Sequence, residues 1–261
     1  MDLLIRAWPL SLVLVMVLAV ACSAPAGPSE PTPASNQDAL PIPTVGSQPV
    51  ADASSSPIPS NAPEGSSVLR TPIGPPPAVD TSISVVPIED VVFDTFRGGF
   101  MRLSDADSKS IERLRDVIKP IYEPKYDPVE KGDWLSDSDL VLGYVGPDSG
   151  NAFAYPVKML NLHEIVNDVI DGTPVLISYC PLCASGVVYD RRLGEDVLLF
   201  GNTSALYQSD LVMYDHQTGS YWFQVLGEAI VGPLSGQRLT MLPSVTAEWG
   251  RWKQLYPRPR Y

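Results

Sequence analysis

Basic residues are few in this chain, and they form no cluster. The 261 residues include 18 Lys and Arg against 30 Asp and Glu, which gives a formal net charge of −12. An acidic protein without a basic cluster is a poor partner for nucleic acid or for anionic lipid headgroups. We therefore expect no nucleic-acid partner, and solubility is a sufficient reason for the acidic balance.

Hydrophobic runs long enough to cross a membrane are also lacking. Beyond residue 21, no stretch approaches the roughly 18 apolar residues that a spanning helix needs. The run at residues 10–20 follows Arg6, is too short to span a bilayer, and ends in small residues directly before Cys22. This pattern predicts a signal peptide over residues 1–21, with a lipid attached to Cys22.

A lipid on Cys22 would fix the location of the protein. A diacylated cysteine supplies two chains, which suffice for stable anchoring, so we expect the membrane as partner and a protein that faces away from the cytoplasm. Ser23 is not the aspartate that typically retains a lipoprotein in the inner membrane, so we expect the outer membrane where there are two, and otherwise the cell membrane. Ala19 stands where lipoprotein signals usually have leucine, so we expect less efficient cleavage, and an ordinary signal peptide followed by a chance cysteine stays the alternative.

Aromatic residues and apolar periodicity are almost absent from residues 23–88, which hold more than half of the 27 prolines. Such a segment cannot bury enough apolar surface to offset the conformational entropy of ordering it. We expect a lipidated, Pro- and Ser-rich disordered linker over residues 22–88 and a single globular domain over residues 89–261. That length is ample for one hydrophobic core, and no internal repeat is evident.

The expected globular part alternates short apolar segments with turn residues. Apolar spacing predicts helices over residues 104–118, 156–170 and 247–255. Segments of strand character lie at residues 140–146, 151–157, 174–180, 185–190, 196–200, 210–215, 220–224, 228–232 and 238–242. We predict an α+β fold, mainly antiparallel β in a meander or an open barrel, with a few helices.

The helix predicted over residues 156–170 would carry its polar side chains on one side: His163, Glu164, Asn167, Asp168 and Asp171. A solvated face explains the acids alone, but His163 is one of only 2 histidines in the chain. The string HEIVN resembles the zinc-protease pattern H-E-x-x-H only in part, because Asn167 is a poor zinc ligand. A metalloprotease is therefore not expected.

Cys180 and Cys183 follow the strand predicted at residues 174–180, in the string YCPLC. Two thiols at this spacing can hold one soft metal ion, cycle between dithiol and disulfide, or form a static disulfide in an oxidising compartment. The chain continues as β structure and opens no helix, so one main cause of a lowered thiol pKa is missing. A static bridge that closes so small a ring gains little loop entropy. Metal binding is the preferred interpretation.

A helix, a short loop and a returning strand can bring His163 beside the two cysteines. His163, Cys180 and Cys183 would then form a three-ligand set for copper or zinc. Glu164 is a candidate fourth ligand, or a general base next to an open coordination position. We therefore predict a transition-metal centre, which can be redox-active if the metal is copper.

The string MYDHQTGSYW at residues 213–222 suits a tight hairpin turn. Asp215 would accept N–H groups of the turn, and Gly219 would adopt a positive φ. This structural interpretation fits the turn chemistry best. The functional alternative makes Asp215 a catalytic carboxylate and places it, with His216, at the rim of the metal cleft.

Seven strings, taken in order over about residues 115–258, resemble an uncharacterised prokaryotic family known as a domain of unknown function. The strings are AYPVKMLNLHEIVND, GTPVLISYCPLC, GVVYDR, FGNTS, SDLVMYDHQTGSYWFQ, GEAIVGPLSGQRL and WGRWKQLYP. Members of the family are often exported, and the resemblance implies one compact domain. It carries the family's recurring positions to His163, Glu164, Asn167, Asp168, Cys180, Pro181, Leu182, Cys183, Asp215, Thr218, Gly219, Ser220 and Trp222.

The resemblance implies no reaction, and this chain departs from the family at one position. The family commonly has arginine where this chain has His216, which argues against His216 as an essential ligand. Two other functions stay open beside a metal centre. One is a thiol–disulfide oxidoreductase that acts on exported proteins, and the other is a non-enzymatic surface module for a ligand or partner protein.

Overall fold

The computed structural model describes residues 71, 72 and 74–261. These residues fall within one structural unit, Asn61–Tyr261. The predicted signal peptide, Cys22 and the part of the predicted linker up to residue 70 lie outside the described residues. No helix in the described part of the chain is long and apolar enough to cross a membrane.

The largest sheet is antiparallel throughout, in the order β14-β13-β12-β11-β1-β2. Its strands are β1 (Val92–Asp94), β2 (Phe100–Arg102), β11 (Phe200–Tyr207), β12 (Asp210–Asp215), β13 (Tyr221–Phe223) and β14 (Glu228–Val231). Strands β11 to β14 form a meander, because each returns beside the one before it. The turn from β12 to β13 contains Gly219 at φ 70°, a conformation that glycine adopts without steric cost.

The second sheet has the order β15-β8-β7-β6-β3 and is antiparallel except where β3 pairs with β6. Its strands are β3 (Ile121–Tyr122), β6 (Ile165–Ile170), β7 (Thr173–Cys180), β8 (Ser185–Asp190) and β15 (Met241–Leu242). Strands β6, β7 and β8 form a second meander. The third sheet, β16-β4-β5, contains β4 (Leu140–Val145), β5 (Ala152–Pro156) and β16 (Ser244–Glu248), and β9 (Arg192–Leu193) pairs with β10 (Asp196–Val197) as a separate hairpin.

The helices are short and lie at the margins of the sheets. They are α1 (Ser108–Leu114), α2 (Val157–His163) and α3 (Trp249–Leu255), with 3-10 turns η1 (Ile88–Asp90), η2 (Leu103–Asp105) and η3 (Val129–Lys131). Asp107 caps α1 by accepting a hydrogen bond from the backbone N–H of Ser110. The helices predicted over residues 104–118 and 247–255 are thus confirmed, with the first one shorter than expected.

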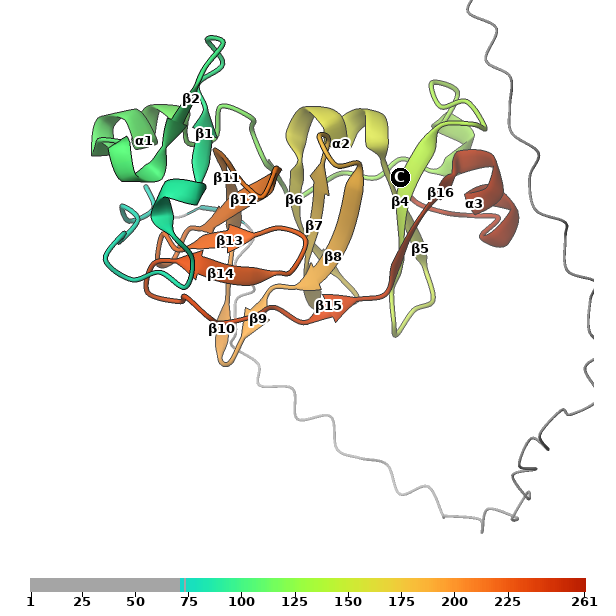
Figure 1. The fold of residues 1–261 in the computed structure, drawn as a ribbon. Helices are drawn as coiled ribbons and strands as arrows, with labels where there is room; N and C mark the ends of the chain where they lie inside the picture. The colour runs from blue at the N-terminus through green and yellow to red at the C-terminus, as the bar shows by residue number, and fades with distance from the viewer. Residues whose placement is uncertain (1–70, 73) are drawn as a thin grey trace, which may run out of the picture. The chain divides into compact units, whose positions relative to one another are not determined.

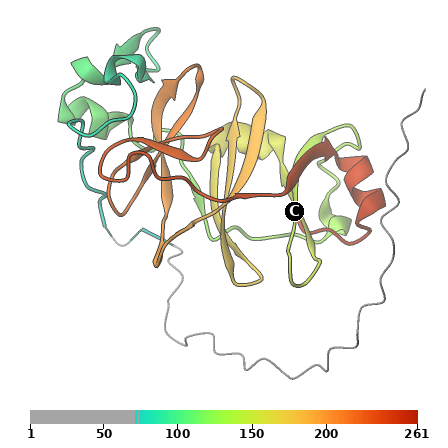
Figure 2. The ribbon, with the colours of Figure 1, turned by 60° about the horizontal axis from the view of Figure 1, so that its bottom comes forward.

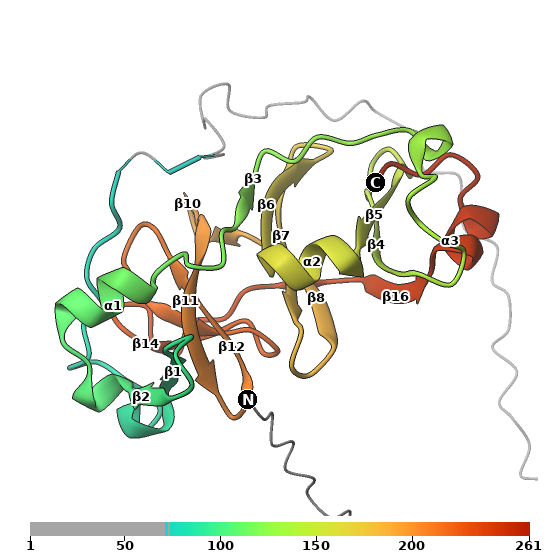
Figure 3. The ribbon, with the colours of Figure 1, turned by 90° about the horizontal axis from the view of Figure 1, so that it is seen from above.

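The three larger sheets lie side by side, with the second sheet in the middle (Figure 1). The same order holds when the molecule is turned, with α1 at one end and α3 at the other (Figures 2 and 3). Between the first two sheets, apolar side chains form a continuous core that includes Leu176, Tyr189, Phe200, Met213 and Trp222. None of the sheets built by the described strands closes into a barrel, and the predicted α+β fold with mainly antiparallel β structure is confirmed.

The helix predicted over residues 156–170 is wrong in its second half. Helix α2 ends at His163, Glu164 adopts φ 59°, and residues 165–170 form β6. The apolar spacing fits both periods, but Ile165, Val166, Val169 and Ile170 are β-branched and favour a strand once partners are present on both sides. The five polar side chains that the prediction placed on one helix face therefore belong to a helix end, a strand and a turn.

The C-terminal part of the predicted linker is in contact with the domain. The backbone N–H of Val85 donates to the carbonyl of Ile230 at 3.0 Å, and that of Gly232 donates to the carbonyl of Ile83 at 2.8 Å. Residues 83 and 85 thus lie along β14, outside the boundary at residue 89 that the sequence predicts.

Candidate functional site

Two thiols and a carboxylate meet where the first two sheets face each other. Cys180 ends β7, Cys183 lies in the turn that leads into β8, and Asp210 begins β12. One ligand atom from each of these residues lies within 4.8 Å of the other two. Among the His, Cys, Asp and Glu side chains of residues 71–72 and 74–261, these three are close enough together to hold one metal ion. We call these three residues the sulfur centre.

Hydrogen bonds hold the sulfur centre together. The Cys183 thiol donates to Asp210 Oδ1 at 2.7 Å, and the backbone N–H of Val225 donates to Asp210 Oδ2 at 3.0 Å. The hydroxyl of Ser185 lies 3.4 Å from the Cys183 sulfur. Asp210 is 5% exposed, so these donors offset much of the cost of burying its carboxyl group.

The two thiols differ in their surroundings. Cys180 is buried and Cys183 is exposed, and both are free. Burial raises the pKa of the Cys180 thiol to about 12, and the neighbouring Cys183 adds to the shift. Without a positive charge nearby, Cys180 therefore stays protonated near neutral pH. A bound cation would reverse this preference, because a coordinating thiol loses its proton to the metal.

His163 does not belong to the sulfur centre. It ends α2, and its Nδ1–H donates to the carbonyl oxygen of Lys119 at 2.8 Å. The ligand set that the structure brings together contains Asp210 in the place where the sequence predicts His163. Asp210 is 27 residues from Cys183 along the chain, and no motif links them. The only signal is an acid at the start of an apolar segment, which many strands share.

Glu164 lies at the joint between α2 and β6, with its side chain buried. Its Oε2 accepts a hydrogen bond from Asn202 Nδ2 at 2.6 Å. Burial raises the pKa of the Glu164 carboxyl group to about 7, and the Asn202 bond opposes the shift. Glu164 lines a cavity of about 250 Å³ together with Pro181 and Leu182 of the turn between the two cysteines. The predicted general base is thus next to the sulfur centre and outside its ligand set.

Asp215 holds the hairpin turn between β12 and β13. Its Oδ1 accepts from the backbone N–H of Thr218 at 2.6 Å, and its Oδ2 accepts from the Thr218 hydroxyl and from Trp222 Nε1, both at 2.9 Å. Burial still raises the pKa of the Asp215 carboxyl group, and these hydrogen bonds oppose the shift. This arrangement is the turn chemistry that the structural interpretation of the sequence expects.

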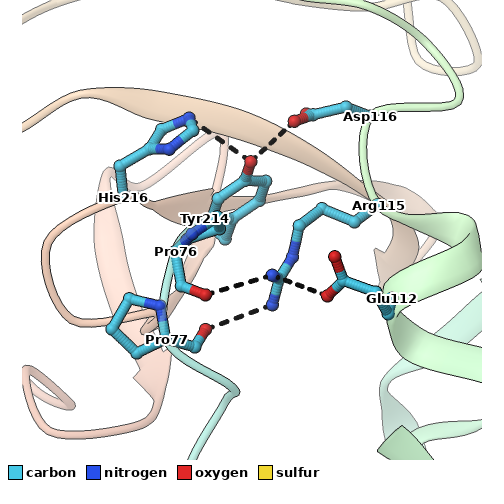
Figure 4. Close-up of polar contacts among 7 residues, drawn as sticks. All are labelled: Pro76, Pro77, Glu112, Arg115, Asp116, Tyr214 and His216. Carbon is cyan, nitrogen blue, oxygen red and sulfur yellow. Dashed lines mark hydrogen bonds and ion pairs between the residues drawn. The ribbon is translucent and has the colours of Figure 1, made fainter. Parts of the chain in front are cut away.

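His216 belongs to a separate polar cluster, shown in Figure 4. Its Nε2 lies 2.9 Å from the Tyr122 hydroxyl and 3.3 Å from the Tyr214 hydroxyl, which donates to Asp116 Oδ2 at 2.6 Å. Burial, with the charge of Arg115 as a smaller cause, lowers the pKa of His216 to about 4. His216 is therefore neutral at physiological pH.

Arg115 ties this cluster to the chain before the domain. Its guanidinium lies 5.0 Å from the centre of the Tyr214 ring and donates to the carbonyl oxygens of Pro76 and Pro77 at 3.4 and 3.2 Å (Figure 4). It also forms an ion pair with Glu112 at 3.0 Å. A planar guanidinium suits this position, because it stacks on the ring and donates at its edge at the same time.

Asn202 links the His216 cluster to the cavity. Its backbone N–H donates to Asp116 Oδ1 at 2.8 Å, and its side-chain amide donates to Glu164. Its Oδ1 accepts from the backbone N–H of Ser204 at 2.6 Å, which fixes the orientation of the amide. Neither Asn202 nor Asp116 was a sequence candidate, because only the tertiary structure brings Asn202 of β11 to both Glu164 and Asp116.

Two more recurring positions support the fold. Asn167 exchanges two hydrogen bonds with the backbone of Phe200, each at 2.8 Å, and so joins β6 to β11. Asp168 accepts from the hydroxyl groups of Tyr126 and Tyr155. Both polar side chains are buried, and each has hydrogen-bond partners, as buried polar groups usually do.

Comparison with known proteins yields a family and no activity. Residues 115–260 match the family described as a protein of unknown function, DUF3179. No curated protein and no solved structure matches the chain. The matched region contains the sulfur centre, Glu164, the Asp215 turn and His216. Because the match covers more than half of the sequence, the chain belongs to the DUF3179 family of proteins of unknown function.

Proposed function

We propose that this protein is a metal-binding domain whose ligands are Cys180, Cys183 and Asp210. The observation that supports the proposal is the sulfur centre itself, with three ligand atoms from two distant segments within 4.8 Å of one another. Two thiolates and one carboxylate match the ligand types of zinc, which takes Cys and Asp in tetrahedral sites. A carboxylate oxygen is a poor ligand for copper(I), so zinc is the expected metal and copper the second choice.

The chemistry of the donor set favours a cation at this place. Asp210 and two thiolates would bring three negative charges into a partly buried site, which is unfavourable without a counter-charge. A divalent ion removes that penalty and releases the thiol protons as it binds. With three protein ligands, a fourth position would be available to water or to a substrate atom. Zinc would act there as a Lewis acid and would lower the pKa of a bound water.

Zinc titration of the reduced, metal-free protein tests the proposal. We expect one zinc per chain, measured by competition with a coloured chelator, and sulfur-to-metal charge-transfer absorption when cobalt replaces zinc. An outer-shell partner typically contributes 10–100-fold to metal affinity, so loss of a direct ligand in Cys180→Ser or Cys183→Ser should weaken zinc binding at least about 100-fold. Ser138→Ala is the control, because Ser138 is exposed and lies outside the sulfur centre, and it should keep the affinity within about threefold. A wild-type protein that binds no stoichiometric metal would overturn the proposal.

A second candidate function is thiol–disulfide exchange. The observation that favours it is a pair of free thiols, one of them exposed, at close range. The raised pKa of Cys180 weighs against it, because the thiolate is the reactive form. Counting free thiols across a redox titration distinguishes the two functions. A pair that cycles reversibly and binds no zinc would favour the oxidoreductase.

We further propose that the protein is anchored to a membrane by a lipid on Cys22 and faces away from the cytoplasm. The support is the sequence pattern of Arg6, the apolar run at residues 10–20 and the small residues before Cys22. Fractionation tests it: the wild-type protein should be in the membrane fraction, and Cys22→Ala should be soluble or unprocessed. A processed Cys22→Ala protein that stays in the membrane fraction would contradict the anchor.

A further inference from the structure

A cavity of about 250 Å³ lies beside the sulfur centre and uses none of its ligands. Five segments of the chain line it. They are the end of β1 and the loop after it (Asp94 and Phe96), the segment between α1 and β3 (Ile118), the end of α2 (Glu164), the turn between the cysteines (Pro181 and Leu182), and strands β11 and β12 (with Asn202 and Leu206). The surface of this cavity is mainly apolar, with a few polar groups that include Glu164 and Asn202, which is the usual construction of a small-molecule site.

The charges of the cavity have one sign. Glu164 and Asp94 are the ionisable residues among those that line it. Asp94 Oδ1 accepts from the backbone N–H of Phe96 at 2.7 Å, which fixes this second carboxyl group at the β1–β2 loop. Lining side chains that are acidic or neutral attract a cation and repel an anion.

The Glu164 carboxyl group is held in place before any ligand arrives. The Asn202 amide donates to its Oε2 at 2.6 Å, and the bond from Ser204 to Asn202 Oδ1 fixes that amide. On the backbone, Glu164 N–H donates to Leu160, and the Glu164 carbonyl accepts from Tyr179, both at 2.8 Å. A carboxylate accepts about four hydrogen bonds, so the group retains capacity for a ligand donor.

The backbone of Glu164 also suggests a purpose for this side chain. It adopts φ 59° at the end of α2, a conformation in which glycine is the usual residue because any side chain is strained there. Strained positions of this kind are concentrated at functional sites. Glu164 has this strained backbone conformation, and its carboxyl group lines the cavity.

We infer that this cavity binds a small organic cation, an amine with a short apolar chain, whose ammonium group pairs with the Glu164 carboxylate. The chain would lie against Phe96, Ile118 and Leu206, and the ammonium group would donate to Glu164. This inference does not rest on the proposed metal, since the cavity is lined by none of the three ligands. The ligand would, however, touch Pro181 and Leu182, so it would share a loop with the sulfur centre.

Three probes of equal chain length test the charge preference: n-hexylamine, 1-hexanol and hexanoate. At pH about 8, NMR titration of the full-length wild-type protein should show the amine bound at least about tenfold more tightly than the alcohol, because a charge-assisted hydrogen bond is roughly twice as strong as a neutral one. Hexanoate should bind more weakly than the alcohol. Resonances of Leu182 and Leu206 should shift with the amine.

Two variants distinguish a role of the Glu164 carboxyl group in binding from an effect on the fold. Glu164→Gln is nearly isosteric, and it should weaken amine binding about tenfold while alcohol binding changes less than about twofold. Glu123→Gln is the matched control, because Glu123 is also a glutamate at positive φ but is exposed and outside the cavity. It should leave all three probes unchanged. Zinc titration of Glu164→Gln reports on the sulfur centre separately.

The inference is overturned if the three probes bind equally, if hexanoate binds best, or if none binds at millimolar concentration. It is also overturned if Glu164→Gln retains the preference for the amine while the protein stays folded. These results leave the metal proposal intact, because zinc binding is measured on the same samples.

Discussion

Strand β12 begins and ends with a buried aspartate, and the two aspartates differ in the origin of their hydrogen-bond donors. Asp215 is 0% exposed and accepts from Thr218 and Trp222, which belong to its own hairpin. Asp210 is 5% exposed and accepts from Val225 and from the thiol of Cys183, which lies in the turn between two strands of another sheet. Burial alone therefore does not separate a structural carboxylate from a candidate ligand, whereas the source of the donors does.

The largest effect is expected at the structural end of β12. Asp215→Ala should lower the free energy of unfolding by about 3–4 kcal/mol, because it leaves the buried Trp222 and Thr218 donors without an acceptor. Urea unfolding monitored by Trp fluorescence measures this loss. Zinc affinity of the folded fraction should stay within about twofold. Asp148→Ala removes an exposed acid and serves as control; a loss of under about 1 kcal/mol in Asp215→Ala would contradict the structural role.

Glu164 and His216 should make opposite contributions to the pH dependence of the free energy of unfolding. The pKa of Glu164 is raised to about 7, so the folded state keeps its proton longer than the unfolded state, and stability from this group is lost as pH rises from 4.5 through about 7. The pKa of His216 is lowered to about 4, so the unfolded state binds the proton more readily, and stability is lost as pH falls from 6.5 through about 4. In the overlapping window the two contributions partly cancel.

Single variants should reveal each contribution, by up to about 3 kcal/mol for a shift of about 2.5 pKa units. Relative to the wild type, Glu164→Gln should gain stability as pH rises from 5 to 8, and His216→Asn should gain stability as pH falls from 6.5 to 4. Urea unfolding at several pH values gives both difference curves. Parallel curves for either variant and the wild type would show that the group does not titrate as the geometry indicates.

At the other end of β12, Asp210→Asn should affect the metal more than the fold. Asparagine keeps an oxygen at this position and loses only the charge, so zinc binding should weaken about 10–100-fold, less than in the cysteine variants and by about 1.4–2.7 kcal/mol, while the free energy of unfolding without metal changes by about 1 kcal/mol or less. The amide oxygen of asparagine still accepts a hydrogen bond. If Asp210→Asn and Asp215→Asn have the same effects on both measurements, the two aspartates do not differ in role.

The smallest effect on zinc affinity is expected for His163, which the sequence predicts as a metal ligand. His163→Asn should change zinc affinity by less than about twofold, because His163 is outside the sulfur centre. Chelator competition on the same preparation as the cysteine variants measures it. A loss as large as that of Cys183→Ser would restore His163 as a ligand.

Much of the fold is predictable because its signals are local. Short apolar runs bounded by turn residues mark β7, β8, β12 and β13, and the Asp215 turn follows from Thr218 and Gly219 within a few residues. The segment 156–170 fails for a physical reason. Its apolar spacing suits a helix and a strand alike, and the choice depends on strands β3 and β7, which pair with residues 165–170 on either side.

The candidate site shows the same division between local and long-range information. The sequence by itself determined the acidic balance, the C-x-x-C pair at the end of a strand, and the family match, because each of these follows from the composition or from the order of residues along the chain. Only the tertiary structure decided that Asp210 and not His163 accompanies the cysteines, and that Asn202 fixes Glu164 beside a cavity. The physical reason is that such partners are set by how sheets pack and in which register, and spacing along the chain carries no record of either.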